Sequence, residues 1–188
     1  MKNLTDIEII ESVLKGNRTD FALLVDRYKD RAYSLLKRML KNEMDAEEAL
    51  QDGFLKVFNS LKDFRQDSKF STWFYRIIYN TALTVISDKK RKIRMEMSSI
   101  DDHYDLKETD ESDQFEYENN EKYILSLVEK LPVRNSLVVI LFYVDNLTIN
   151  EISSILGLSV ENTKVILYRS RNILRELLLK YNYQENLL

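Results

Sequence analysis

The chain contains no cysteine, one histidine, one proline and three glycines among its 188 residues. Without cysteine it can form no disulfide, no thiolate metal site and no cysteine nucleophile. The single histidine, His103, has no second histidine with which to build a zinc site, and the sequence offers no histidine-based triad. A glycine-rich phosphate loop is missing too. We therefore expect no catalytic residue, no metal site and no cofactor.

Long hydrophobic runs are also missing. No apolar stretch approaches the roughly 18 residues that cross a bilayer. The residues from Met1 to Asp6 lack the apolar segment of a signal peptide. We expect an intracellular, cytoplasmic protein without direct membrane insertion.

The composition is that of a helical globular protein. With 44% hydrophobic residues and few residues that force turns, it predicts an all-α fold of one large domain or two small ones. The net charge of −3 is unevenly spread, because Lys and Arg outnumber Asp and Glu by 19 to 14 in residues 1–95. Residues 96–122 carry 2 basic and 11 acidic side chains, and residues 123–188 carry 7 basic and 6 acidic side chains. The acidity belongs to the middle, so the average charge does not argue against a nucleic-acid partner.

Hydrophobic spacing predicts one helical domain over residues 1–95. Thr5 to Glu8 fits a capping box, and a second helix is expected to begin near Thr19. Asp45 is expected to cap a third helix. Residues 64–71 break the pattern and are predicted to be a loop, after which a fourth helix starts at about Thr72.

Periodicity disappears over residues 96–118, where acidic side chains dominate. A segment of this kind buries too little apolar surface to offset its ordering entropy, so we predict a flexible acidic linker. Three of its acidic residues, Asp101, Asp102 and Asp105, lack the glycine turn and final glutamate of a calcium loop and are interpreted as solvated charge.

A second helical domain is predicted over residues 119–188. Pro132 suits the end of one helix and the start of the next. Thr148 to Glu151 is another capping box, Gly157 makes a turn, and Ser159 is expected to cap a last helix that reaches about Leu179.

The segment from Thr148 to Arg175 has the pattern of a helix-turn-helix, which suits a duplex major groove. The inward stripe of its last helix consists of Thr163, Leu167, Ser170, Leu174 and Leu177. The outward side chains suited to base edges and phosphates are Lys164, Val165, Tyr168, Arg169 and Arg171. The alternative is a helical hairpin with a solvated basic face.

Six aromatic side chains followed by a basic run lie between Phe64 and Arg94. Aromatic faces can stack on unpaired bases while cations hold the phosphates. Because a small domain needs aromatic residues in its core, we expect Trp73, Ile77 and Ile78 to be structural. The residues suited to capturing an extruded base are Phe64, Arg65, Asp67, Ser68, Lys69, Phe70 and Asn80. The cations from Lys89 to Arg94 exceed what capping a helix end requires, which favours phosphate contact.

Taken in order, these segments resemble the bacterial sigma-70 family, in particular the small extracytoplasmic-function (ECF) sigma factors. DAEEALQDGFLKVF (45–58) is similar to the region 2 helix that docks on the beta-prime clamp helices of RNA polymerase. FRQDSKFSTWFYRIIYNTAL (64–83) resembles the segment that melts and reads the −10 promoter element. Residues 131–177 resemble region 4, which reads the −35 element.

The resemblance implies residue roles and partners. It assigns Glu48, Gln51, Asp52 and Leu55 to core polymerase binding. It places Phe64, the loop from Arg65 to Phe70, Asn80, Arg76 and the cations Lys89, Lys90 and Arg91 at the −10 strand. It puts Lys164, Val165, Tyr168, Arg169 and Arg171 at the −35 site. The implied partners are core RNA polymerase, through its beta-prime clamp helices and beta flap, promoter DNA and an anti-sigma factor.

Two positions depart from the family pattern, and two other functions stay open. Ile166 stands where the family often has arginine, and Ile78-Tyr79 replaces a small residue, which leaves the promoter sequence open. The first alternative is a stand-alone helix-turn-helix regulator that binds DNA as a dimer. The second is a nuclease with Asp101 and Asp105 as metal ligands.

Overall fold

A computed structural model describes residues 4–97 and 120–185. These residues form only helices and connecting turns, as the sequence predicts. The first four helices are α1 (Asp6–Leu14), α2 (Phe21–Leu40), α3 (Glu43–Ser60) and α4 (Phe70–Met97), with short 3-10 turns at Arg18–Asp20 and Leu61–Asp63. The other four are α5 (Asn120–Glu129), α6 (Val133–Tyr143), α7 (Ile149–Leu156) and α8 (Val160–Glu185). We call residues 4–97 the front domain and residues 120–185 the rear domain.

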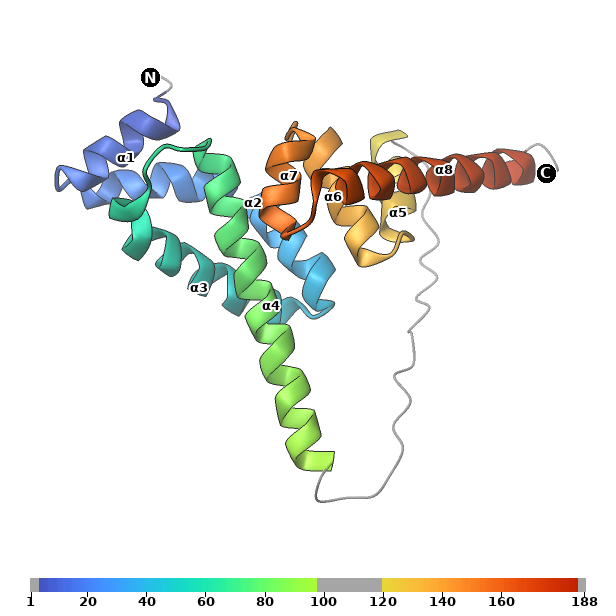
Figure 1. Ribbon diagram of the computed structural model, residues 1–188, viewed down its shortest axis with the longest axis horizontal. Coiled ribbons are helices and arrows are strands. Elements are labelled where there is room, and N and C mark those ends of the chain that lie inside the picture. The colour runs from blue at the N-terminus through green and yellow to red at the C-terminus, as the bar shows by residue number, and fades with distance from the viewer. Residues whose placement is uncertain (1–3, 98–119, 186–188) are drawn as a thin grey trace.

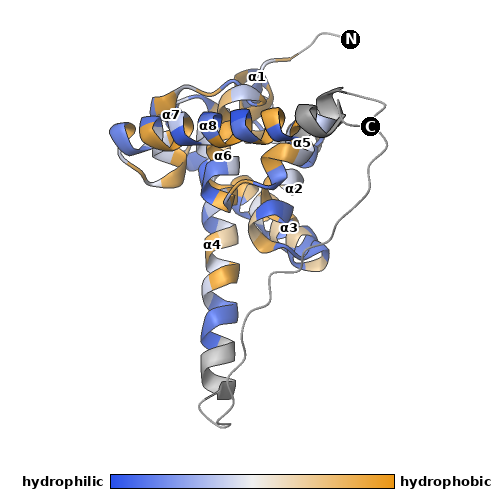
Figure 2. Ribbon diagram, turned by 90° about the vertical axis from the view of Figure 1, so that its right-hand side faces the viewer, coloured by the Kyte–Doolittle hydropathy of each residue, from blue (hydrophilic) through white to orange (hydrophobic). Residues whose placement is uncertain are grey.

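In the front domain α2 and α3 pack against the first half of α4, and α1 packs on α2 (Figure 1). Tyr28 of α2 lies at its centre, with its ring 4.8 Å from that of Phe74 and 5.5 Å from that of Phe70. The close approach of α3 to α4 depends on Gly53, because a Cβ there would lie 2.5 Å from Cδ1 of Ile78. Beyond this core α4 projects from the domain, and the last turn that Figure 2 colours is hydrophilic.

Local signals place most helix starts correctly, with two exceptions in the front domain. The capping box of Thr5 and Glu8 is present as predicted. Asp45 does not cap α3: the side chain of Asn42 accepts from the Asp45 backbone N–H at 2.9 Å, so the helix begins earlier. α4 begins at Phe70 rather than Thr72 because burial of the Phe70 ring, 2% exposed, draws that residue into the helix.

In the rear domain α6, α7 and α8 begin where the sequence predicts a signal. Pro132 precedes α6, and the hydroxyl and backbone of Thr148 form a capping box with Glu151 at α7. Gly157 adopts a left-handed φ of 64°, which turns the chain after α7. Ser159 then caps α8, accepting from the Asn162 N–H at 3.1 Å. α8 runs to Glu185, longer than predicted, since its second half continues the same helix without a stop signal.

The predicted linker falls mostly outside the described residues. α4 extends through Met97, two residues into the segment predicted to be linker, and α5 begins at Asn120. The remaining linker positions, 98–118, lie outside the described residues. The linker and its boundaries therefore stay predictions.

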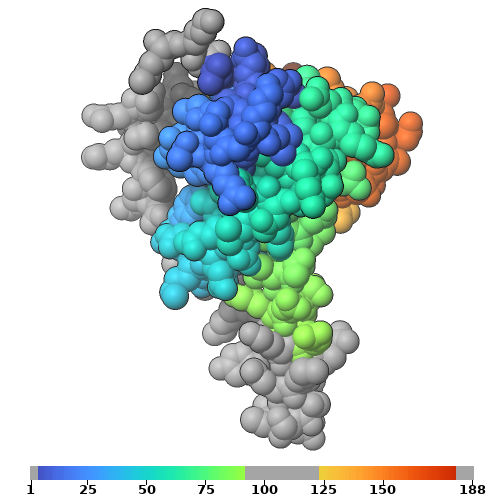
Figure 3. Space-filling model, turned by 90° about the vertical axis from the view of Figure 1, so that its left-hand side faces the viewer, coloured from blue at the N-terminus to red at the C-terminus, as the bar shows by residue number. Residues whose placement is uncertain are grey.

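The two domains lie against each other, which the sequence did not predict. α7 packs against α4, and α6 approaches α2 (Figure 1). In the space-filling view from the side of α1, the front domain is one continuous body with rear-domain atoms against its edge (Figure 3). We call this contact the seam.

Candidate nucleic-acid interface

The loop predicted to meet an unpaired base lies over an aromatic cluster. Phe64 is half-buried, and its ring lies 5.3 Å from that of Trp73 and 5.6 Å from that of Phe70. Phe70 is buried and offers no free face in this structure. The cluster therefore supports the loop from beneath, and the open side chains of the loop are polar.

Those polar side chains reach solvent. Arg65 and Asp67 are 84% and 76% exposed and pair with each other at 3.3 Å. Ser68 is exposed, and Lys69 is 66% exposed. The loop thus presents a cation on each side of Asp67, an arrangement suited to a strand with alternating bases and phosphates.

The adjoining face of α4 continues this surface. Arg76 and Asn80 are exposed and lie four residues apart, one turn from each other on the same side of the helix. The half-buried Trp73 lies one turn before Arg76. Ile78 is fully buried and belongs to the core, as predicted. An amide and a guanidinium thus flank an aromatic edge, which provides hydrogen bonding and stacking in one place.

The basic run lies further along α4. Lys89, Lys90 and Arg91 are exposed. Lys89 forms an ion pair with Asp45 of α3, so this cation is shared between the protein and any phosphate. The α4 side chains from Lys92 to Met97 are not among those that the structure describes.

α3 presents a separate exposed face. Glu48, Gln51, Asp52 and Leu55 all point outward at helical spacing, and Leu55 is 60% exposed. Met44, which the sequence analysis missed, lies one turn before Glu48 on this face and is 81% exposed. Met44 lies off the face of α3 that carries the buried residues, and this helical spacing is the signal that could have identified it as exposed. An exposed apolar stripe bordered by acidic groups suits a protein partner rather than DNA.

The helix-turn-helix has the predicted inward and outward sides. Thr163, Leu167 and Ser170 are buried, at 0%, 3% and 0% exposure. Leu174 and Leu177 are partly buried. The outward residues Lys164, Val165, Tyr168 and Arg169 are exposed, and Tyr168 is 65% exposed. The first two turns of α8 therefore present a mixed basic and apolar surface able to meet base edges.

Arg171 is held in place by α6. Its Nε donates to the Tyr143 hydroxyl at 2.6 Å, and its guanidinium lies 5.6 Å and 5.5 Å from the ring centres of Phe142 and Tyr143. This anchoring fixes the direction of the guanidinium, which suits a backbone contact at the edge of a groove.

Polar contacts across the seam join the rear domain to the loop before α4, to α4 and to α2. Glu151 of α7 lies 3.2 Å from Lys69 Nζ and accepts from the Thr72 hydroxyl at 3.3 Å. Asp145, after α6, accepts from the Tyr75 hydroxyl at 3.0 Å and lies 3.4 Å from Arg31. Burial raises the pKa of Asp145, although the hydrogen bond from Tyr75 and the charge of Arg31 oppose it.

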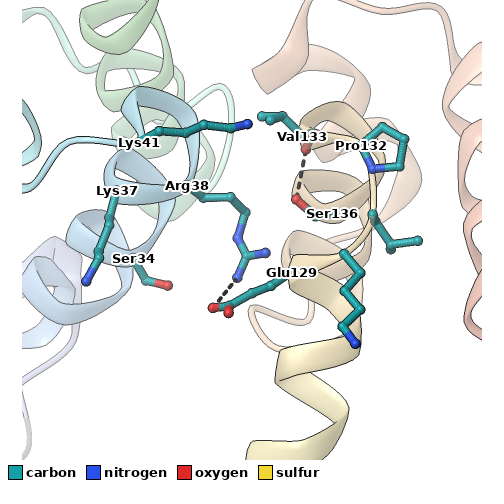
Figure 4. A pocket seen from close by; sticks show the side chains of 10 residues that line it. Ser34, Lys37, Arg38, Lys41, Glu129, Pro132, Val133 and Ser136 are labelled. Atoms are coloured by element: carbon teal, nitrogen blue, oxygen red, sulfur yellow. Dashed lines mark hydrogen bonds and ion pairs between the residues drawn. The ribbon is translucent and has the colours of Figure 1, made fainter. Parts of the chain in front are cut away.

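A cavity of about 660 Å³ opens at the other end of the seam (Figure 4). Arg38 points across it to Glu129, and their charged groups are 3.6 Å apart. Burial lowers the pKa of Arg38. Lys37, Lys41 and Ser136 also line the cavity.

Neither metal nor membrane chemistry is indicated in the described part of the chain. No group of three or more His, Cys, Asp or Glu residues there could hold a metal ion. Among the described helices, none combines the length and apolar character needed to cross a membrane. His103 and the acidic residues proposed for the nuclease alternative lie outside the described residues.

Comparison with protein families gives two matches in order along the chain. Residues 24–92 match Sigma-70 region 2, and residues 121–174 match Sigma-70, region 4. The ECF RNA polymerase sigma factor SigW of Bacillus subtilis is 34% identical over 178 residues, which are 89% of this chain and 93% of that protein. The ECF RNA polymerase sigma-E factor of Escherichia coli is 29% identical over 177 residues, which are 90% of this chain and 92% of that protein.

Solved structures share the fold. CnrH in complex with the cytosolic domain of CnrY aligns with a TM-score of 0.59 and 23% identity, covering 90% of this chain and 94% of that chain. The sigma factor RpoE in complex with the anti-sigma factor NepR from Bartonella quintana aligns with a TM-score of 0.63 and 16% identity. The alignment covers 85% of this chain and 96% of that chain. At these identities the likeness concerns the fold alone.

Proposed function

The chain belongs to the ECF family of RNA polymerase sigma factors, and from this premise we propose which of its surfaces reads each part of a promoter. Its function is to bind core RNA polymerase and direct promoter-specific transcription initiation. The front domain corresponds to region 2 and the rear domain to region 4. The observation that carries the proposal is that both matched regions expose polar or basic side chains at most of the positions expected to meet DNA.

The front domain is proposed to capture the separated non-template strand at the −10 element. Arg65, Ser68, Lys69 and Asn80 surround the aromatic cluster and are exposed, so they can contact an extruded base and its phosphates. Stacking contributes roughly 1–3 kcal/mol per base, enough to offset an unstacking cost of a few kcal/mol over several bases. Lys90 and Arg91, further along α4, would hold the backbone nearby.

The rear domain is proposed to read the −35 element as duplex. The start of α8 would enter the major groove, with Lys164 and Arg169 donating to base acceptors or phosphates and Val165 and Tyr168 touching thymine methyl groups. Arg171, fixed by Tyr143, would contact the backbone.

The exposed face of α3 is proposed to dock on the beta-prime clamp helices of the polymerase. Leu55 and Met44 supply apolar area, and Glu48, Gln51 and Asp52 supply polar contacts around it. We further propose contact with the beta flap, control by an anti-sigma factor, a cytoplasmic location, and no reaction catalysed by the chain itself. The stand-alone dimeric regulator is not favoured, because the region 2 match occupies the half that it would need for dimerisation.

A reconstitution experiment tests the proposed function. The purified chain is mixed with core RNA polymerase, co-purification is measured, and run-off transcription is performed on genomic fragments. We expect stable association and transcripts from a small set of fragments that core polymerase alone does not use. Failure to bind core polymerase, or no new transcript, would contradict the proposal.

A further inference from the structure

The cavity of about 660 Å³ between the end of α2 and the turn from α5 to α6 is lined mainly by cations (Figure 4). Its charged lining residues are Lys37, Arg38, Lys41, Lys130 and Glu129. With four cations and one carboxylate, the lining has a net charge of +3. A cavity of this volume has room for a small organic molecule, and its charge favours an anionic one.

Arg38 is the most informative of these residues, because its guanidinium is buried without a hydrogen bond. Its side chain is 11% exposed, and its charged group lies 3.6 Å from that of Glu129, which is longer than a hydrogen bond. Among the buried side-chain nitrogen and oxygen atoms of the described residues, Nε of Arg38 alone lacks a hydrogen-bond partner. Burying a cation without hydrogen bonds is costly. An anionic ligand would supply acceptors that the described part of the protein does not give this guanidinium.

The dipole of α2 explains only part of the cationic lining. Lys37 and Arg38 lie in the last turn of α2, where the helix dipole favours cations. Lys37 also pairs with Glu43 at 2.5 Å. Lys41 lies just beyond the helix, forms no ion pair among the described residues, and extends toward Val133 in Figure 4. The dipole therefore accounts for Lys37, but not for the burial of Arg38 or for a cation that faces the start of α6.

The opposite wall of the cavity contributes the positive end of a helix. α6 begins at Val133, which lines the cavity, and the first backbone N–H groups of an α-helix have no acceptor within the helix. Pro132, which precedes it, supplies no side-chain cap. The dipole of α6 therefore favours negative charge at the place toward which Lys41 extends. The two walls are suited to the same anionic group.

We propose that this cavity binds a small molecule that carries two or more phosphate groups. Phosphate matches the lining because its oxygens accept from a guanidinium, from an ammonium group and from the N–H groups at a helix start. A lining charge of +3 balances a short chain of phosphates rather than a single one. The proposal goes beyond the proposed function, because none of the lining residues is assigned to promoter DNA or to the polymerase.

Isothermal titration calorimetry on the full chain tests the proposal with three probes. They are magnesium-free ATP, inorganic triphosphate and adenosine, in about 0.15 M salt, which screens attraction between exposed charges. We expect saturable binding of one ATP or one inorganic triphosphate per chain, and no binding of adenosine. Tighter binding of ATP than of triphosphate would assign the site to a nucleotide, and equal binding to the phosphate chain alone. If neither phosphate compound binds saturably, or if adenosine binds as tightly as ATP, the proposal is wrong.

Two substitutions and a matched control locate the site. Lys41→Ala removes an exposed cation and should weaken ATP binding about tenfold. Glu129→Gln removes the carboxylate that competes for Arg38 and should tighten ATP binding about twofold to fivefold. Lys29→Ala removes an exposed cation earlier in α2 that pairs with Asp26 of the same helix, and should leave the affinity unchanged. Equal losses in Lys41→Ala and Lys29→Ala would show diffuse attraction and would overturn the site.

Arg38→Met separates a role in ligand binding from a role in folding. The substitution keeps a long side chain but removes the charge, so thermal stability should stay unchanged or rise, because a cation buried without hydrogen bonds costs free energy. ATP affinity should fall about tenfold or more. Thermal unfolding and calorimetry measure the two effects. A lower unfolding midpoint with unchanged ATP affinity would make Arg38 a structural residue and refute the proposal.

A nucleic-acid backbone also carries phosphates, and the Lys41→Ala variant distinguishes it from a small molecule. The probe is a fluorescent single strand of oligothymidine, titrated with the unmutated chain and with Lys41→Ala. We expect the substitution to leave strand affinity unchanged while it weakens ATP binding, because the cavity is separate from the loop and the α4 face proposed to meet DNA. If strand affinity falls as much as ATP affinity, the cavity contacts a nucleic-acid backbone and the small-molecule proposal fails.

Discussion

The hydroxyl of Tyr75 donates to the carboxylate of Asp145 at 3.0 Å, across 70 residues of sequence. Tyr75 lies in α4 among the core aromatic residues and is 2% exposed, yet its oxygen reaches the other domain. Burial raises the pKa of this tyrosine, and the adjacent Asp145 raises it further. The phenol therefore stays protonated and remains a donor throughout the physiological pH range.

Contact between the two domains should respond to pH through Asp145. Burial raises the pKa of Asp145 where it meets the front domain, so domains in contact hold this proton more tightly than separated domains. The contact should therefore strengthen as pH falls from 7 toward about 4, the ordinary range for aspartate. Energy transfer between fluorophores on Glu11→Cys in α1 and Glu176→Cys in α8, both exposed positions, measures the contact across this range.

Asp145→Asn is the control for this titration. The amide oxygen still accepts from Tyr75 but carries no charge, so this variant should hold the two domains together more tightly at pH 7 and show no strengthening over the same range. For Glu151, burial raises the pKa, but hydrogen bonds from Thr148 and Lys69 outweigh it and the pKa is lowered. Protonation of Glu151 therefore acts in the opposite direction and cannot strengthen the contact at low pH. If the pH response persists in Asp145→Asn, a titratable group other than Asp145 causes it.

Asn80→Ala should impair promoter opening without weakening polymerase binding. The exposed amide lies beside the aromatic cluster, and loss of one hydrogen bond to a base would cost about 1 kcal/mol, roughly fivefold in open complex. Permanganate footprinting measures opening, and co-purification measures core binding. If core binding falls instead, Asn80 belongs to the polymerase interface.

Arg169→Ala should weaken binding to the −35 duplex in a sequence-dependent way. A base contact supplies roughly 1–3 kcal/mol of discrimination, so the preference for the correct site should drop by between about 5-fold and 150-fold. Arg175→Ala, an exposed arginine further along α8, is the matched control and should change less. Equal loss on every sequence would make Arg169 a phosphate contact.

Leu55→Asp should reduce affinity for core polymerase. Burying a leucine at an interface contributes about 1.5–3 kcal/mol, which corresponds to roughly 10-fold to 150-fold in Kd. Leu23→Asp provides the comparison, because Leu23 on α2 is also an exposed leucine. Its side chain is 45% exposed, and that of Leu55 is 60% exposed. Titration of fluorescent chain with core polymerase gives both values, and similar losses in the two variants would argue against the α3 face as the docking surface.

Gly53→Ala should destabilise the front domain although alanine favours helices. The added methyl would lie 2.5 Å from Cδ1 of Ile78, whose side chain is fully buried. Overpacking costs about 1–3 kcal/mol against a propensity gain of about 1 kcal/mol. Ile78→Val removes that Cδ1, so in the double variant Gly53→Ala should become neutral or stabilising. Denaturant unfolding of the four proteins measures the coupling; strictly additive effects would contradict it.

Much of the fold could be predicted because its signals are local. The capping boxes at Thr5 and Thr148, the turn at Gly157 and the helix start after Pro132 each depend on residues within one turn. The two errors have different causes. Burial of Phe70 against the rest of the domain brought the start of α4 forward, which the local sequence does not indicate. At α3 two neighbouring residues could both serve as a cap, and the side chain of Asn42 rather than that of Asp45 does so.

The outward residues of the candidate site were predictable for the same reason, since helical spacing separates one face from another. Lys164, Asn80 and Leu55 are exposed as that spacing requires. The seam was not predictable, because nothing in the sequence around Asp145 or Glu151 indicates a partner some 70 to 80 residues earlier. Only packing of the two domains shows that these carboxylates meet Lys69, Thr72 and Tyr75.

The uninterrupted course of α4 has a geometric consequence. Asn80 and Arg91 belong to one helix, so at 1.5 Å per residue they are held roughly 16 Å apart. The helix itself therefore fixes the distance between the base contact proposed for Asn80 and the phosphate contact proposed for Arg91. Inserting a single residue between them would swing one side chain about 100° around the axis relative to the other. A single rigid element thus sets the spacing of the two proposed contacts.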